Sequence, residues 1–495
     1  MSAGKGLLDR RRAGVLLHPT SLPSPYGTGD LGHAAWRFVE FLASAGFSVW
    51  QVLPLGPTHA ERSPYDAVSA FAGNPALISL DWLHDRGFLD HAMLARVAAH
   101  AAGRADALAA AAIAFAVRLD TDAALAADLA AFRERHAYWL PDYARYCALR
   151  EAQGAKPWYH WPAPLRAREP TALAEADAQH AARIAALVFE QYVFDRQWRE
   201  LSAWAAGAGV HVFGDIPIFV SHDSADVWAH PGLFRLAPDG SLPVETGVPP
   251  DYFSADGQRW GNPHYDWEAM AADDYRWWRA RVAQQRTRFA LLRIDHFRGF
   301  EASWEIPRGA RTAAEGRWIP GPPPALLAAL AAIAGPGGLV AENLGTITEA
   351  VESLRRAHGM PGMLVLQFGF DGSPANPHLP HNHEHDAVVY TGTHDNDTAL
   401  GWFLSLDEPV REHVRAYLGH PAEPMPLPLV RATLASVASL AVLPLQDLLG
   451  LDGTARMNRP GLASGNWRWQ LDGNPFDAAL AAHCRALLSL YGRIA

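Results

Sequence analysis

The feature of the sequence that most constrains the fold is a repeated alternation of two kinds of segment. Short apolar runs rich in β-branched residues each end at a loop of Gly, Pro, Asn, Asp or His, and helix-like segments such as 33–45 and 325–334 lie between several of them. Eight such units favour an α/β fold, a parallel (β/α)8 TIM barrel, over an antiparallel sandwich, although a doubly wound open sheet would give a similar pattern. The eight predicted strands are residues 15–17, 49–55, 210–220, 290–297, 339–341, 364–368, 387–390 and 442–445.

The spacing of these strands is uneven, which locates two insertions. The longest gap follows the second strand, and within it residues 92–131 contain 20 alanines in 40 positions, a composition that favours helix. We therefore predict a mainly helical insertion over residues 84–206. A second segment, 221–275, is rich in Gly, Pro and aromatic residues and is predicted to form loops over the active-site cleft. The catalytic barrel is then assigned to residues 1–83 and 207–495.

Composition excludes several classes of function. The formal net charge is −10 and the basic run at 10–12 stands alone, so a nucleic acid has no evident docking surface. The apolar stretch 107–117 is too short to span a membrane, and residues 13–17 are too short for the apolar core of a secretion signal. Cys147 and Cys484 are too few for a disulfide framework. We expect a cytoplasmic protein with no nucleic-acid or membrane partner.

Three of the predicted strands change from apolar to acidic at their carboxyl ends, at Asp295, Glu342 and Asp395. These ends form one face of a barrel, so the three acids should share a pocket. Arg293 points to the same side of its strand as Asp295 and can keep that carboxylate ionised, as a nucleophile requires; a buried ion pair that only closes the barrel mouth is the alternative. Glu342 could instead cap a helix, and Asp395 could belong to a polar turn. Crowded carboxylates raise the proton affinity of one of them, which provides the acid and base that glycosidic bond cleavage needs.

Motifs that extend over nearly the whole chain carry a family resemblance. They are residues 17–22, 63–65 with 69–75, 214–217, 247–253, 257–263, 293–298, 392–397, and 456–458 with 465–467. In these motifs the chain resembles the amylomaltases, the 4-α-glucanotransferases also called disproportionating enzymes, of the α-amylase-like glycoside hydrolase clan. The resemblance implies a retaining double displacement that transfers α-1,4-glucan segments from a donor to an acceptor glucan or glucose. Its substrates would be maltooligosaccharides, amylose and glycogen-derived dextrins, and the enzyme would be a monomer or a homodimer.

The resemblance also implies roles for particular residues. Asp295 would be the nucleophile, Glu342 the acid/base, and Asp395 the acid that holds sugar hydroxyls and stabilises the transition state. Tyr65 would stack under the sugar at the cleavage point. The implied substrate-binding residues are Ser63, Tyr65, Asp215, Tyr252, Phe253, Gln258, Trp260, Arg293, His394 and Asn466.

The chain departs from the family pattern at two positions near these residues. Asn343 stands where many members carry Asp, which makes the field on Glu342 less negative, and Arg459 places a charge at a usually uncharged position. Two other functions stay open: an α-1,4-glucan hydrolase that uses the same carboxylates, and a noncatalytic glucan-binding or NAD-binding protein.

Two further patterns resemble metal or cofactor sites. The histidines at 378, 381, 383 and 385 have a spacing that suggests zinc, but the surrounding Pro and Asn residues indicate a loop with solvated histidines. Residues 27–32 match a dinucleotide-binding fingerprint, yet residues 18–26 separate them from the strand that should come immediately before. We therefore expect neither a metal nor a cofactor.

Overall fold

The computed structural model describes residues 6–250, 256–462 and 464–494. Within these residues, eight parallel strands form one sheet in the order β10-β11-β12-β1-β2-β3-β6-β9. Each predicted strand supplies one of them, so the predicted (β/α)8 architecture is confirmed. The strands are β1 (Arg12–Leu16), β2 (Val49–Gln51), β3 (His211–Pro217), β6 (Leu291–Asp295), β9 (Leu339–Ala341), β10 (Gly362–Val365), β11 (Ala387–Tyr390) and β12 (Leu440–Pro444).

The sheet is nearly closed where its two outer strands, β9 and β10, approach each other. The N–H of Ala341 donates to the carbonyl of Pro361 at 2.9 Å, and the N–H of Met363 donates to Asn343 Oδ1 at 2.7 Å. Side chains alternate along each strand, so one set fills the barrel interior. Leu291 belongs to this inner core, and Arg293 follows it on the same side of β6. Arg293, the first charged residue of β6, therefore lies where the apolar core of the barrel ends.

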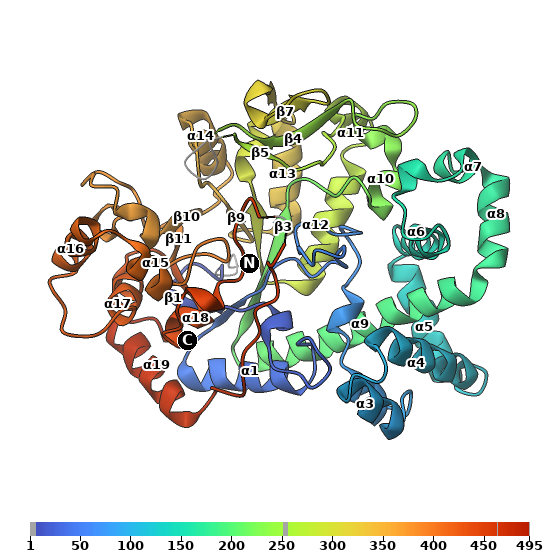
Figure 1. Cartoon of the computed structure of the whole chain (residues 1–495), viewed down its shortest axis with the longest axis horizontal. Coiled ribbons are helices and arrows are strands. Elements are labelled where there is room, and N and C mark those ends of the chain that lie inside the picture. Colours follow the sequence, from blue (N-terminus) through green and yellow to red (C-terminus); the bar gives the residue numbers. More distant parts are fainter. Residues whose placement is uncertain (1–5, 251–255, 463, 495) are drawn as a thin grey trace, which may run out of the picture.

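Helices cover the outside of the barrel (Figure 1). The predicted helices at 33–45 and 325–334 are present as α1 and α13. Gly46 ends α1 in the left-handed conformation, which glycine adopts without steric cost. The covering helices include α1 (His33–Ala45), α12 (Arg276–Arg288), α13 (Pro324–Ala334), α14 (Glu349–Ala357), α15 (Ala399–Ser405), α16 (Glu408–Tyr417), α17 (Leu427–Ala435), α18 (Leu445–Leu448) and α19 (Ala478–Leu490).

The segment between β2 and β3 is mainly helical, as predicted from its alanine content. Figure 1 shows most of these helices to one side of the barrel, and the long helix α9 leads back to it. No helix of the described residues is long and apolar enough to cross a membrane, α9 included. The helices are α2 (Leu80–Asp85), α3 (His91–Ala98), α4 (Arg104–Leu119), α5 (Ala123–Arg135), α6 (Leu140–Ala152), α7 (Ala163–Arg166), α8 (Pro170–Gln179) and α9 (Ala181–Gly207).

The expectation that segment 221–275 consists of loops is wrong in part. It contains helices α10 (Ala225–Ala229) and α11 (Trp267–Ala272) and strands β4 (Val244–Val248) and β5 (Gln258–Arg259). These strands join β7 (Ala302–Pro307) and β8 (Arg317–Pro320) in an antiparallel sheet of order β5-β4-β7-β8. Because β7 and β8 follow β6 in the chain, this pairing is non-local and leaves no signal in the segment itself. Figure 1 shows β4, β5 and β7 together at one edge of the barrel.

Candidate active site

A cavity of about 600 Å³ opens at the carboxyl ends of the barrel strands, and the three predicted acids line it. Asp295 is the last residue of β6, Glu342 directly follows β9, and Asp395 lies in the loop after β11. Their side chains differ in accessibility: Asp295 is 27% exposed, Asp395 is 44% exposed, and Glu342 is buried. The structure thus brings together three carboxyl groups that are far apart in the sequence.

Arg293 lies between two of the carboxyl groups of this region. Its Nη2 is 2.8 Å from Asp295 Oδ1, and its Nη1 donates to Asp215 Oδ2 at 2.7 Å. The register of the sheet explains the second contact, because Arg293 on β6 is the direct partner of Asp215 on β3. Burying such charges unpaired would cost several kcal/mol, so the guanidinium both neutralises Asp215 and fixes the position of Asp295.

Glu342 is held by the main chain around it. The N–H groups of His296 and Leu344 donate to its two carboxyl oxygens at 2.6 and 2.8 Å. Burial, followed by the negative charge of Asp295, raises the pKa of Glu342 to about 7, although Arg293 and the two N–H groups act in the opposite direction. A carboxyl group with this pKa can donate a proton near neutral pH and take one back.

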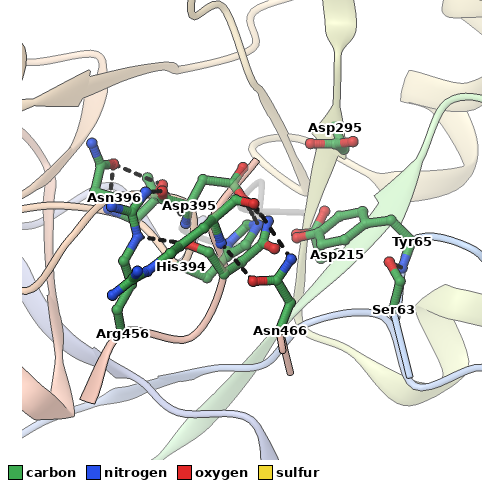
Figure 2. Close-up of polar contacts among 12 residues, drawn as sticks. Ser63, Tyr65, Asp215, Asp295, His394, Asp395, Asn396, Arg456 and Asn466 are labelled. Carbon is green, nitrogen blue, oxygen red and sulfur yellow. Dashed lines mark hydrogen bonds and ion pairs between the residues drawn. The ribbon is translucent and has the colours of Figure 1, made fainter. Parts of the chain in front are cut away.

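Asp395 is positioned from a different part of the chain. Asn458 Nδ2 donates to its Oδ1 at 2.6 Å, His394 Nε2 lies 3.4 Å from the same oxygen, and Arg456 Nη2 donates to its main-chain carbonyl at 2.7 Å. Figure 2 shows Asp395, His394 and Arg456 on one side of the site and Asp295 on the other. The loop after β12 therefore fixes the acid that follows β11.

Tyr65 connects the two sides of the site. Its hydroxyl donates to Asp215 Oδ2 at 2.7 Å, and its ring stacks on His394 with centroids 5.1 Å apart. The indole of Trp467 packs against both rings, 5.9 Å from Tyr65 and 5.8 Å from His394. Burial raises the pKa of Tyr65 and lowers that of His394, so both rings are neutral. The rings of Tyr65, His394 and Trp467 therefore form one aromatic cluster next to the carboxyl groups.

The remaining predicted site residues divide into three groups. Tyr252 and Phe253 lie outside the described residues. Asp215 and His394 are not among the cavity-lining residues; they lie behind Tyr65 and Asp395 and contact them. The other predicted binding residues line the cavity: Ser63, Tyr65, Gln258, Trp260, Arg293 and Asn466.

Two of the lining residues have their polar groups engaged within their own loops. Asn466 accepts a hydrogen bond from the N–H of Arg459 at 2.9 Å and donates to the carbonyl of Leu462 at 2.9 Å, so it orders the rim loop that it belongs to. Gln258 Oε1 accepts from Trp260 Nε1 at 3.2 Å. The Arg459 main chain is thus fixed by Asn466, and its side chain lies at the exposed rim of the cavity.

His296 is a cavity residue that the sequence analysis did not single out. It adopts a left-handed backbone conformation with φ of +54°, and its N–H donates to Glu342 Oε2 at 2.6 Å. Burial lowers the pKa of its ring to about 3, and its Nε2 has no hydrogen-bond partner among the described residues. This backbone conformation accompanies the contact of the His296 N–H with Glu342. In the sequence, the only indication that His296 lies in the cavity is its position directly after Asp295.

The histidine segment is not arranged as a metal site. Among the described residues, no group of three or more His, Cys, Asp or Glu side chains could hold a metal ion. The expectation of solvated histidines is also wrong in part, because His383 is buried and His378 is half-buried, whereas His381 and His385 are exposed. Both rings belong to the loop that connects β10 to β11, and His383 contacts Ser436 after α17.

An eight-stranded parallel barrel with an acidic cavity at the carboxyl ends of its strands defines a TIM-barrel enzyme. A family model described as 4-alpha-glucanotransferase matches residues 17–475. The chain therefore belongs to the 4-alpha-glucanotransferase family, and the resemblance seen in its motifs is confirmed.

Individual relatives agree with this assignment over the full length. The 4-alpha-glucanotransferase of Thermus thermophilus is 46% identical over 504 residues, which cover 98% of this chain and 99% of that protein. The enzyme of Synechocystis sp. is 45% identical with the same coverage. The structure of an amylomaltase from Streptococcus agalactiae in complex with acarbose matches with a TM-score of 0.93 at 35% identity, covering 98% of this chain and 100% of that one.

Proposed function

We propose that this chain cleaves an α-1,4-glucan and transfers the released segment to the 4-hydroxyl of an acceptor glucan or glucose, with retention at the anomeric carbon. One observation carries the proposal. In a single cavity, Asp295 is fixed by Arg293 at 2.8 Å while the pKa of Glu342 is raised to about 7. An oriented carboxylate beside a protonated carboxyl group is the arrangement that a retaining glycosidase mechanism needs.

In the first step, an oxygen of Asp295 attacks the anomeric carbon of the donor, and the bond to the leaving sugar breaks. Glu342 gives its proton to the oxygen of that leaving sugar. The product is a covalent glycosyl-enzyme and a shortened glucan. Arg293 orients the attacking carboxylate, because its guanidinium forms an ion pair with Asp295.

In the second step, Glu342 takes the proton of the acceptor 4-hydroxyl, whose oxygen attacks the anomeric carbon and releases Asp295. A pKa of about 7 suits a group that must both give and take a proton near neutral pH. The two inversions at one carbon retain its configuration.

Other side chains of the cavity bind the sugar. Asp395 is the most exposed of the three acids and would accept hydrogen bonds from two sugar hydroxyls. The neutral His296 would bind a further hydroxyl through Nε2. Tyr65 would stack under the sugar with Ser63 beside it, while Asp215 and His394 act from behind as positioning residues.

Transfer must outrun hydrolysis although water is present at about 55 M, so the acceptor has to be held at high effective concentration while water is limited. The rim loop that carries Asn458, Arg459 and Trp467 lines the cavity together with Trp260, which supports this requirement. The alternative is a hydrolase that uses the same carboxyl groups.

We propose maltooligosaccharides, amylose and glycogen-derived dextrins as donors. The support is family membership together with the acarbose complex of the Streptococcus agalactiae relative. We further propose a cytoplasmic enzyme that works as a monomer or homodimer, without metal or cofactor.

Incubation with maltotriose tests the proposal. A transferase yields glucose and a ladder of longer glucans while the number of reducing ends stays constant. A steady rise in reducing ends would instead identify a hydrolase, and unchanged maltotriose would leave only glucan binding.

A further inference from the structure

An exposed tryptophan lines the cavity without a role in the mechanism above. Trp318 lies on β8, the outer strand of the antiparallel sheet β5-β4-β7-β8, and is 37% exposed. Large apolar side chains this exposed are few among the described residues. What sets Trp318 apart is its place on the lining of this cavity, where an exposed indole offers an apolar surface to a ligand.

Two neighbours fix the orientation of this ring. The guanidinium carbon of Arg298 lies 3.6 Å from the ring centroid, a cation–π contact that covers one face. Trp304, the direct partner of Trp318 in the β7–β8 pair, meets it at 5.0 Å and 68°. Trp304 is itself held, because its Nε1 donates to the carbonyl of Ala313 at 2.8 Å. Arg298 and Trp304 therefore hold the indole in one orientation, and part of it remains exposed at the cavity.

Arg298 connects this ring to the reaction centre. It belongs to the 3-10 helix η5 (Phe297–Phe300), which begins two residues after Asp295, and its Nη1 donates to the carbonyl of Thr346. Its side chain is buried, and its Nε has no hydrogen-bond partner among the described residues. The buried guanidinium therefore anchors the indole against the segment that follows β6.

We propose that Trp318 is a stacking platform for a glucose unit of the glucan other than the unit that reacts at Asp295. This inference deepens the proposed function and rests on it. A glucose ring has an apolar C–H face, which can stack on the exposed part of a flat indole. The platform and the three acids line the same cavity, so one glucan chain can reach both.

The reacting sugar does not need this platform. Asp295 ends β6 of the eight-stranded barrel, whereas Trp318 lies on β8 of the separate four-stranded sheet. The proposal therefore places the glucose unit on Trp318 away from the unit at the cleavage point. Long glucans should gain from the platform, whereas the shortest donors should not.

The test compares two donors in a Trp318→Ala variant. We expect kcat/KM for maltoheptaose to fall about tenfold and that for maltotriose to change by less than about twofold, the size of one lost stacking contact. Trp204→Ala is the matched control, because Trp204 is also an exposed indole, 44% exposed on α9, and is not among the cavity-lining residues. It should leave both values unchanged.

Equal losses for both donors, or no loss for either, would overturn the platform. Trp318→Phe keeps an aromatic face and should recover most of the maltoheptaose activity, whereas Trp318→Leu should not. These two variants also test the platform if Trp318→Ala fails to fold. Equal kcat/KM for maltoheptaose in Trp318→Phe and Trp318→Leu would exclude stacking.

A failure of the proposed function would look different. Wild-type enzyme that leaves maltotriose unchanged removes the transferase proposal, but maltoheptaose binding to the Asp295→Asn variant can still be measured by calorimetry. In that background, Trp318→Ala should weaken binding of maltoheptaose about tenfold and leave maltotriose binding within about twofold. If Asp295→Asn and Asp295→Asn/Trp318→Ala bind maltoheptaose equally well, the proposed platform is wrong, whatever the activity of the wild type.

Discussion

Two regions of this molecule are dense in ionisable side chains, and only one of them has the properties of an active site. The first is the carboxyl group cluster of Asp295, Glu342 and Asp395 at the barrel mouth. The second is the histidine segment, residues 378–385, in the connection between β10 and β11. Both stand out in the sequence because reactive residue types are crowded together.

The ring nitrogens of the histidine segment are used within the fold. His383 Nδ1 is hydrogen-bonded to Ser436 Oγ at 2.7 Å and its Nε2 to the carbonyl of His378 at 2.9 Å, and His378 Nδ1 accepts from the N–H of Val365 at 3.1 Å. Burial lowers the pKa of both rings, so they are neutral structural groups.

The carboxyl cluster differs because its groups face a cavity of about 600 Å³. Asp295 and Asp395 remain partly exposed after their contacts with Arg293 and Asn458 are counted. The comparison teaches that crowding of ionisable residues is a weak sign of a site, whereas polar atoms left open toward a cavity are a strong one.

The largest expected effect comes from removing the nucleophile. Asp295→Asn should lower maltotriose turnover by about 10⁴-fold or more, because the amide cannot form the glycosyl-enzyme. Glucan binding, measured by calorimetry, should persist. Asp371→Asn, an exposed acid near the histidine segment, is the control and should retain full turnover. Comparable turnover in the two variants would contradict the assigned role.

The acid/base comes next in size. Glu342→Gln should lower turnover by about 10²- to 10⁴-fold, because proton transfer to the leaving oxygen is lost. Wild-type kcat/KM should fall about tenfold per pH unit above pH about 7, as Glu342 loses its proton, and this alkaline limb should be absent in the variant. An alkaline limb that persists in Glu342→Gln would assign the titration to another group.

Much of this arrangement was predictable from the sequence because it follows local rules. Each barrel strand is an apolar run that ends in polar residues, and the strand ends of a barrel must converge. The pairing of Arg293 with Asp295 follows from side-chain alternation along one strand. Its second contact, with Asp215 on β3, depends on the register between two strands and has no local signal.

Long-range pairing explains the features that the sequence did not show. The sheet that carries Trp318 pairs β4 with β7, although β6 lies between them in the sequence. The sequence of either strand therefore does not indicate its partner. The sequence predicts solvated histidines because their loop is rich in Pro and Asn. Nothing in that loop indicates that Ser436, which directly follows α17, contacts and helps to bury His383.

A smaller effect should come from Asn343, the residue that directly follows Glu342. Its Nδ2 donates to Glu352 Oε1 at 2.6 Å, and its Oδ1 accepts from the N–H of Met363 across the closing strands. Asn343→Asp replaces the donor with a second carboxylate next to Glu342. We expect the alkaline limb to move to higher pH, a change in turnover at pH 7 within about threefold, and lower stability.

The double variant Asn343→Asp/Glu352→Gln is the matched control, since the new amide can donate to the new carboxylate. It should recover the stability but keep the shifted pH profile, as a urea titration and a pH–rate profile can show. A pH profile that stays in place in both variants would mean that the charge at 343 does not reach Glu342.

The smallest effect on turnover should come from His383. His383→Ala should keep maltotriose turnover within about twofold while it lowers the free energy of unfolding by about 1–3 kcal/mol, because Ser436 Oγ and the carbonyl of His378 lose a buried partner. The urea midpoint measures this loss, and His385→Ala, an exposed position of the same segment, is the control. A fall in turnover larger than the fall in folded fraction would move this segment into the functional machinery.

The pH dependence of stability separates His383 from Glu342 by sign. The folded protein lowers the pKa of His383, so the stability from this ring is present above its ordinary value of 6.5 and is lost as pH falls; the gap between wild type and His383→Ala should narrow in acid. Glu342 behaves in the opposite way. Its raised pKa means that its contribution is present below 4.5 and is lost as pH rises through about 7. A buried group that destabilises the fold at working pH is retained for chemistry, whereas one that stabilises it there needs no function beyond the fold.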